Sequence, residues 1–301
     1  MEYNKTLVVT SFDENYFNYA CVPIKTLGLN YSGTPKLNVR CLVPENLQKR
    51  ESEFIDIIDQ NNLDIKFITS EKYTNFEDSG FAFEKDYITK NMHHRLFLGS
   101  TFIDYDKVIY IDPDTLILRD VKPLLDYEIF TPIAAVVEYT GMSLRTFNQK
   151  DLPYFNNGVF IADLNYWRKE NLEDQFVNWI EENGPTECPE QDAMNAIFRN
   201  KWSPLPLTFN LLAFKLIEDR KLAENYPEPL IVHFVGNYKP WNETPIPIWT
   251  EKWQKEFSAL FTVSIFPWPE SSYRRQKRSA VLEADGGGHG GGHGPAKWPK
   301  T

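Results

Sequence analysis

The stretch Lys107-Val-Ile-Tyr-Ile111, followed by Asp112-Pro-Asp114, determines how the rest of the chain is interpreted. An apolar run rich in β-branched and aromatic residues is typical of a buried strand. Ligands of open α/β sheets collect beyond the carboxyl ends of the strands, which is where Asp112 and Asp114 fall. Two carboxylates separated by one residue can share a divalent cation with phosphate oxygens. The stretch therefore predicts an α/β protein with a cation site at the end of a strand.

The Asp-Pro-Asp triplet is weak evidence by itself. A second Asp-x-Asp, Asp104-Tyr-Asp106, precedes the strand, and acidic turns often only cap a helix or face solvent. A strand as apolar as 107–111 nevertheless needs a reason to end in two charges. The position of the triplet therefore favours a functional site.

Strand-like and helix-like segments alternate along most of the chain. We expect strands at 6–10, 37–43, 65–68, 107–111, 133–137, 158–162 and 230–234. We expect helices at 16–27, 47–61, 87–102, 172–182 and 190–198. This alternation predicts a parallel sheet with helices on both faces, and the proline-rich segment 240–248 is expected to end the regular pattern.

Charge is distributed unevenly along the 301 residues. The formal net charge is −10, but residues 270–301 are basic overall and rich in glycine, so we expect them to form a disordered tail. His289 and His293 in this tail are more typical of a linker than of a functional metal site. An acidic body argues against nucleic acid as a partner, and binding of a diphosphate would require a local countercharge such as a metal.

Cys21, Cys41 and Cys188 are too few and too widely spaced for a disulfide framework or a thiolate zinc site, so we expect reduced thiols. The apolar runs fall far short of the roughly 20 residues that a transmembrane helix needs. The N-terminal residues lack the features of a secretory signal. These observations predict a cytoplasmic protein without a transmembrane segment.

Two further motifs carry polar groups to the ends of predicted elements. His233-Phe-Val-Gly-Asn-Tyr-Lys-Pro-Trp241 follows an apolar strand, so His233 could supply a third metal ligand on the same edge of the sheet, although a lone histidine is more often bonded to backbone. Asn156-Asn-Gly158 enters another strand, and Glu190-Gln-Asp192 opens a helix. Amides and carboxylates there suit sugar hydroxyls, and they are equally ordinary first-turn residues.

Taken in order, these motifs closely resemble glycosyltransferase family 8, which includes glycogenin and bacterial lipopolysaccharide galactosyltransferases. The matching segments are Thr10…Tyr16, Arg95, Asp112–Thr115, Phe155–Val159, Glu190–Asn195 and His233–Trp241. They span roughly residues 6–242. The histidine motif is the most specific of them, and its place downstream of the Asp-x-Asp makes coincidence improbable.

The resemblance implies a GT-A fold in a single domain, 1–269, with a mixed, mostly parallel sheet flanked by helices. It implies a retaining transferase with a UDP-sugar donor, a sugar, polyol or glycoprotein acceptor, and Mn²⁺ or Mg²⁺ as the metal. By position in the motifs, the metal ligands would be Asp112, Asp114 and His233. The other site residues would be Thr10 and Tyr16 near the uridine, Arg95, Gly236 and Lys239 at the diphosphate, and Asn157, Glu190, Gln191 and Asp192 at the donor sugar and acceptor.

The residues around Gln191 bear on the mechanism and the donor. Gln191 matches the residue beneath the anomeric carbon, and because an amide is a poor nucleophile, front-face attack is favoured over a covalent intermediate. Glu190 stands where the family more often has Asp, so the donor preference is left open.

The sequence leaves three other interpretations. They are a glycogenin-like self-glycosylating protein, a non-catalytic UDP-sugar-binding protein and a nucleotidyltransferase. The last is disfavoured because Thr10–Asn15 is acidic and lacks the glycines of a triphosphate-binding loop. The aromatic residues of 241–268 could serve as a lid, a homodimer contact, a membrane-surface anchor or, as we favour, a cover for the core.

Overall fold

The computed structural model describes residues 5–70, 90–138, 147, 152–184, 186–214, 228–237, 239–242 and 247–261. One compact unit spans Met1–Leu260, and the architecture below is that of this unit. The predicted tail, 270–301, and residues 87–89 of the helix expected at 87–102 lie outside the described residues. Among the described helices, none combines the length and the apolar character needed to cross a membrane.

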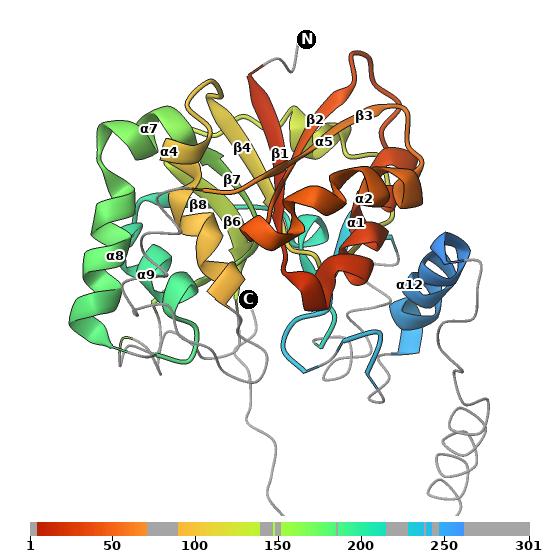
Figure 1. The fold of residues 1–301 in the computed structure, drawn as a ribbon. Coiled ribbons are helices and arrows are strands. Elements are labelled where there is room, and N and C mark those ends of the chain that lie inside the picture. Colours follow the sequence, from red (N-terminus) through yellow and green to blue (C-terminus); the bar gives the residue numbers. More distant parts are fainter. Residues whose placement is uncertain are drawn as a thin grey trace, which may run out of the picture. The chain divides into compact units, whose positions relative to one another are not determined.

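A seven-stranded sheet forms the centre of this unit (Figure 1). Across the sheet the strands are β3 (Leu63–Ile68), β2 (Leu37–Leu42), β1 (Thr6–Ser11), β4 (Lys107–Ile111), β7 (Phe155–Asp163), β6 (Ile133–Val137) and β8 (Trp202–Pro204). The strands from β3 to β4 are parallel, β7 runs antiparallel to both neighbours, and β8 is parallel to β6. The expected mixed, mostly parallel sheet is thus confirmed.

The α-helices are α1 (Phe17–Leu29), α2 (Glu51–Ile58), α4 (Leu98–Thr101), α5 (Lys122–Leu125), α7 (Leu164–Lys169), α8 (Leu172–Asn183), α9 (Pro189–Ile197) and α12 (Pro247–Leu260). Two of the expected helices differ from the helices in the structure. The segment 47–61 begins in a 3₁₀ helix, Glu45–Arg50, and α2 ends where Asp59 adopts a left-handed backbone conformation. The described part of 87–102 is mostly a 3₁₀ helix, Lys90–Phe97, whose buried residues include polar ones, so a single apolar stripe does not set its conformation.

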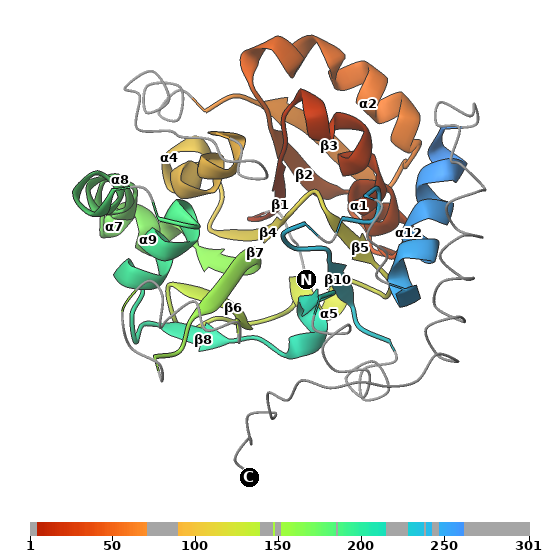
Figure 2. The same ribbon diagram turned by 90° about the horizontal axis from the view of Figure 1, so that it is seen from below.

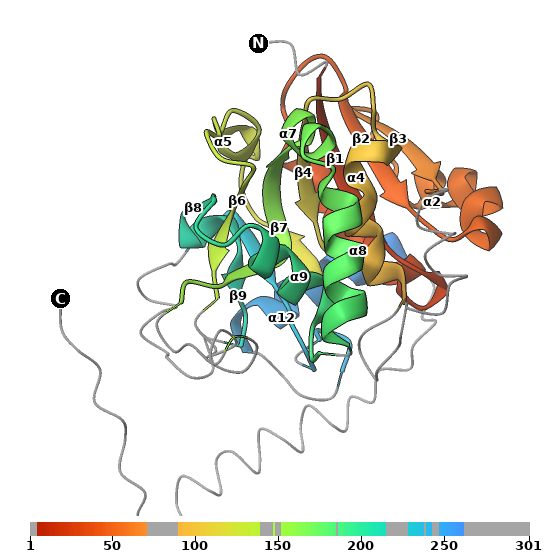
Figure 3. The same ribbon diagram turned by 90° about the vertical axis from the view of Figure 1, so that its left-hand side faces the viewer.

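One core cluster joins the sheet to a group of helices. Trp167 of α7, Phe176 of α8 and Met194 of α9 pack with Val108 and Phe160 of the central strands. Figure 3 shows α7, α8 and α9 together beside β7. Because these side chains are almost completely buried, the packing fixes α9 against β7, and α9 carries the predicted Glu190–Asp192 motif.

A second sheet of three strands, β5 (Thr115–Ile117), β10 (Ile231–His233) and β9 (Leu211–Leu212), lies next to the Asp112–Asp114 turn. β10 pairs antiparallel with β5 and parallel with β9. The expectation that His233 lies on an edge of the main sheet is therefore wrong. The chain continues from the turn directly into β5, so pairing with β5 still brings His233 next to the two aspartates.

The expectation that 240–248 ends the regular structure is also wrong, because α12 follows it. Trp249, Trp253 and Phe257 recur every fourth residue, which is the spacing of one face of a helix. That face packs with Tyr19 of α1 in a second core cluster, and Figure 2 shows α12 alongside α1. Trp241, Trp249, Trp253 and Phe257 therefore cover the core, which is the role that the sequence favoured for the aromatic residues of 241–268. Phe266 and Trp268 lie outside the described residues.

Candidate active site

The Asp112–Asp114 turn joins β4 to β5 and is held at both ends. The Asp112 amide donates to the carbonyl oxygen of Gly158 in β7 at 2.7 Å, and the Thr115 hydroxyl donates to the carbonyl oxygen of Asp112 at 2.9 Å. Both carboxylates are buried, with residue exposures of 7% and 6%. The turn thus holds two acidic side chains in a fixed place away from bulk water.

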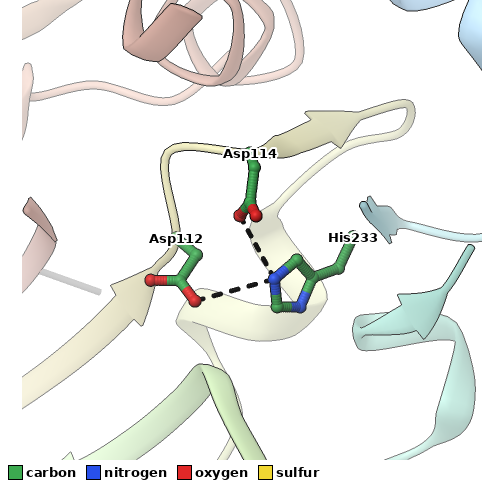
Figure 4. Close-up of side chains that lie close together, drawn as sticks. All are labelled: Asp112, Asp114 and His233. Atoms are coloured by element: carbon green, nitrogen blue, oxygen red, sulfur yellow. Dashed lines mark ion pairs between the residues drawn. The ribbon is translucent and has the colours of Figure 1, made fainter. Parts of the chain in front are cut away.

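His233 faces both carboxylates (Figure 4). Its Nε2 lies 3.2 Å from Asp114 Oδ1 and 3.6 Å from Asp112 Oδ2. Gly158 makes this approach possible, because a Cβ on that residue would lie 2.0 Å from His233 Cε1 and 2.7 Å from Asp112 Oδ2. A side chain at position 158 would therefore displace the group that the two strands bring together.

Each carboxylate also has its own cation. Arg95 donates to Asp112 at 2.6 Å and 3.3 Å, and the same guanidinium donates to the carbonyl and side-chain oxygens of Asn157 at 2.9 Å and 3.1 Å. Lys239 Nζ contacts Asp114 Oδ2 and donates to the carbonyl oxygen of Phe234 at 2.9 Å. The two ion pairs neutralise the two buried carboxylates.

The two aspartates differ in acidity. Burial raises the pKa of Asp112, and this outweighs the opposing effect of Arg95. Burial also acts to raise the pKa of Asp114, but Lys239 and His233 together outweigh it and hold that pKa below its usual range. Asp114 is therefore the more strongly acidic member of the pair.

The donor set fits a divalent cation. One ligand atom from each of Asp112, Asp114 and His233 can be chosen so that all lie within 4.8 Å of one another. Two carboxylate oxygens and one imidazole nitrogen suit Mn²⁺ or Mg²⁺ in the company of phosphate oxygens. The three side chains predicted as ligands are thus brought together.

The second part of the site is a network of amides between β7 and α9. Gln191 Oε1 accepts from the backbone N–H of Asn157 at 3.0 Å and from Asn156 Nδ2 at 3.3 Å. Gln191 Nε2 donates to the Tyr154 hydroxyl at 3.3 Å. The Tyr154 hydroxyl donates to Asp192 Oδ1 at 2.5 Å. Arg95 joins this network to Asp112 through Asn157.

Glu190 is 1% exposed, and within the described part of the chain its Oε2 has no hydrogen-bond partner. A buried carboxylate oxygen without a partner is costly, and a sugar hydroxyl is one donor that would satisfy it. Glu138 Oε2 accepts from Asn156 Nδ2, the atom that also donates to Gln191, at 3.2 Å. Both carboxylates therefore belong to the surroundings of Gln191.

Thr10, Tyr16 and Gly236 are the other residues predicted at the nucleotide. Thr10 is the last residue but one of β1, and its hydroxyl is buried without a partner among the described residues. The Tyr16 ring packs edge-on against Trp241, and burial together with the charges of Asp114 and Asp112 raises the pKa of its hydroxyl. Gly236 has a φ of +62°, a conformation that favours glycine.

Tyr154 and the role of Gly158 were not predicted from the sequence. Both residues lie in or next to the Asn-Asn-Gly motif, of which only the amides were expected to suit sugar hydroxyls. Asn210 Oδ1 lies 3.1 Å from His233 Nδ1, and no sequence motif pointed to Asn210.

Comparison with solved structures identifies the class of fold. The galactosyltransferase LgtC, solved with donor and acceptor sugar analogs, superposes with a TM-score of 0.70 at 22% identity, covering 88% of this chain and 98% of LgtC. The bifunctional glycosyltransferase WbbM superposes with a TM-score of 0.65 at 20% identity, covering 90% of this chain and 51% of WbbM. The chain therefore has the GT-A fold that the sequence predicted.

The family follows from the sequence profile of glycosyl transferase family 8, which matches residues 7–245. The chain belongs to this family. It is 34% identical over 178 residues to General stress protein A of Bacillus subtilis, a match that covers 54% of this chain and 62% of that protein. It is 27% identical over 175 residues to lipopolysaccharide 1,2-glucosyltransferase of Escherichia coli, covering 52% of this chain and 51% of the relative. The chain thus spans less than two thirds of these relatives.

Proposed function

We propose that this chain is a metal-dependent, retaining glycosyltransferase that moves a hexose-type sugar from a UDP-sugar to an acceptor hydroxyl. The observation that carries the proposal is the buried group of Asp112, Asp114 and His233, whose ligand atoms lie within 4.8 Å of one another. Family membership and the named activities of relatives, such as the lipopolysaccharide glucosyltransferase, support it.

Asp112, Asp114 and His233 would hold Mn²⁺ or Mg²⁺. When bound, the cation would offset the negative charge that builds on the departing UDP. Arg95 and Lys239 already neutralise the two carboxylates, so the positive charge of the loaded site would be available to a diphosphate. Lys239 lies against Asp114, from where a small movement would let its ammonium group contact a phosphate oxygen.

The amide network supports front-face attack. Both accepting positions of Gln191 Oε1 are used by Asn157 and Asn156, and an amide oxygen is a weak nucleophile in any case. Gln191 would therefore stabilise charge beside the anomeric carbon instead of forming a bond to it. The acceptor hydroxyl would then attack from the face that UDP leaves, which retains the configuration.

Slow transfer of the sugar to water provides a test that needs no knowledge of the acceptor. A panel of UDP-sugars is incubated with the protein in Mn²⁺, Mg²⁺ or EDTA, and release of UDP is measured. We expect one donor to be cleaved with metal and not with EDTA. Cleavage that is equally fast in EDTA would contradict the metal dependence.

The same reactions distinguish the two alternatives. An increase in the intact mass of the protein by one or more sugars would identify a self-glycosylating protein. Metal-dependent UDP binding without cleavage, even with sugar, polyol and glycoprotein acceptors present, would identify a non-catalytic UDP-sugar-binding protein. The cytoplasmic location and a homodimer stay predictions.

A further inference from the structure

Asn210 is a completely buried amide beside the candidate metal site. It directly precedes β9, and β9 pairs with β10 so that Leu212 lies opposite His233. Its Oδ1 lies 3.1 Å from His233 Nδ1, and its Nδ2 donates to Asn156 Oδ1 at 2.8 Å. Asn210 therefore lies between His233, which faces the two aspartates, and the amide network around Gln191.

Two backbone amides fix the orientation of the neighbouring Asn156 side chain. The Gly158 amide donates to Asn156 Oδ1 at 3.0 Å, so that atom must be the carbonyl oxygen. The Asn157 amide donates to Gln191 Oε1, which makes the atom of Asn156 that faces Gln191 its amino group. Because a backbone N–H can only donate, neither step depends on a choice of side-chain hydrogen positions.

The orientation of Asn210 follows from that of Asn156. The atom of Asn210 that faces Asn156 Oδ1 must donate, so it is Nδ2, and Oδ1 is the atom that faces the His233 ring. An amide oxygen only accepts, and His233 Nδ1 must therefore carry a proton. In the neutral ring, Nε2 is then left with a lone pair directed at Asp112 and Asp114.

We infer that Asn210 is a positioning residue that holds His233 in the Nδ1–H form and so presents Nε2 as a metal ligand. Ligating histidines commonly donate their other ring nitrogen to such a partner, which fixes both tautomer and ring orientation. The same side chain donates to Asn156, which in turn donates to Gln191. Asn210 thus has two separable functions, as acceptor towards the metal site and as donor towards the Gln191 network.

The tautomer can be measured directly in the wild-type protein, without metal or nucleotide. A long-range ¹H–¹⁵N spectrum at pH 8 reports which ring nitrogen carries the proton, and comparison with His233→Gln assigns the signal among the five histidines. We expect a proton on Nδ1 of His233, whether or not Nε2, which faces two carboxylates, also carries one. A proton on Nε2 alone would overturn the inference.

Two variants separate the functions of Asn210, and this part of the test rests on the proposed function. Asn210→Ala removes the acceptor, so Mn²⁺ affinity measured by calorimetry should fall about 10- to 100-fold. Asn210→Asp keeps an acceptor for Nδ1–H and should bind Mn²⁺ more nearly as the wild type does. Both lose the donor to Asn156 and should lower turnover.

The control is Asn183→Ala, which removes an exposed amide of α8 and should bind Mn²⁺ normally. Mn²⁺ affinity in Asn210→Ala equal to that of the wild type would overturn the inference. If the wild type binds no Mn²⁺, the proposed function fails, while the ¹⁵N spectrum still decides the role of Asn210. The spectrum also decides it if the variants do not fold, as judged by circular dichroism.

Discussion

The two halves of the candidate site are built in different ways. On the side of the Asp112–Asp114 turn, opposite charges meet in pairs, Asp112 with Arg95 and Asp114 with Lys239. On the side of α9, amides, a tyrosine hydroxyl and the Asp192 carboxylate form hydrogen bonds around Gln191. The first arrangement suits a cation and a diphosphate, whose charges are large and fixed. The second suits a sugar, whose hydroxyls require oriented donors and acceptors. Binding of the nucleotide and transfer of the sugar should therefore respond to different substitutions.

Of the substitutions proposed here, a change at Gly158 should have the strongest effect, because it should disturb both halves of the site. Gly158→Ala places a Cβ 2.0 Å from His233 Cε1, so Mn²⁺-dependent UDP binding should be lost. Forcing an atom into this space should also lower the free energy of unfolding by about 1–3 kcal/mol, which thermal or urea unfolding measures.

A second substitution tests whether His233 causes this loss of stability. In a His233→Ala background the ring that meets the new Cβ is absent, so part of the stability cost of Gly158→Ala should disappear, while the part due to the 2.7 Å approach to Asp112 Oδ2 should stay. An undiminished cost in that background would show that His233 is not the group displaced.

The next effect should be confined to the charged half. Lys239→Met removes the cation beside Asp114, so UDP affinity in Mn²⁺ should fall about 10- to 100-fold, as expected for a charged hydrogen bond. Without nucleotide, Mn²⁺ should bind at least as tightly as in the wild type, because a competing positive charge is gone. Calorimetry measures both affinities, and Lys252→Met on the exposed side of α12 is the control. Weaker Mn²⁺ binding without nucleotide would contradict the assignment of Lys239 to nucleotide binding alone.

The third effect should be confined to the amide half. Tyr154→Phe removes the hydroxyl that donates to Asp192 and accepts from Gln191, so turnover should fall about tenfold for the loss of a buried hydrogen bond. The Mn²⁺ and UDP affinities should not change. Tyr166→Phe, on the partly buried side of α7, is the matched control. A loss of Mn²⁺ affinity in Tyr154→Phe would show that the halves are coupled more strongly than their contacts indicate.

The smallest effect concerns the loop that carries Lys239. Gln254 of α12 donates to the carbonyl oxygen of Pro240 at 2.9 Å, and Trp241 stacks on Tyr19 with ring centroids 3.9 Å apart. Gln254→Leu should therefore weaken UDP binding only about threefold, the value of one neutral hydrogen bond, and leave turnover at saturating donor unchanged. Lys252→Leu should have no effect on either quantity.

Much of this molecule could be predicted from the sequence, because its strongest signals are local. The apolar run 107–111 and the alternation of strands and helices predicted the main sheet. The motifs predicted residues in both halves of the site. A strand at 230–234 was expected and contains β10, but its sheet could not be predicted, since β5 and β9 are short and become strands only by pairing with β10. Asn210 was missed for the same reason: only the pairing of β9 with β10 brings it to His233.

α12 was missed because Pro240, Pro245 and Pro247 suggested an end to regular structure. Proline is tolerated in the first turn of a helix, and α12 begins at Pro247. The repeated aromatics at 249, 253 and 257 were the better signal, and their spacing indicates a helix with one buried face.

Asp112, Asp114 and His233 are proposed to bind a divalent cation that UDP requires. The most direct test is calorimetric titration of the wild type and Asp114→Asn with UDP, each in Mn²⁺ and in EDTA. We predict binding to the wild type in Mn²⁺, and none in EDTA or in a folded Asp114→Asn variant. Equal UDP affinity under all four conditions would contradict the account.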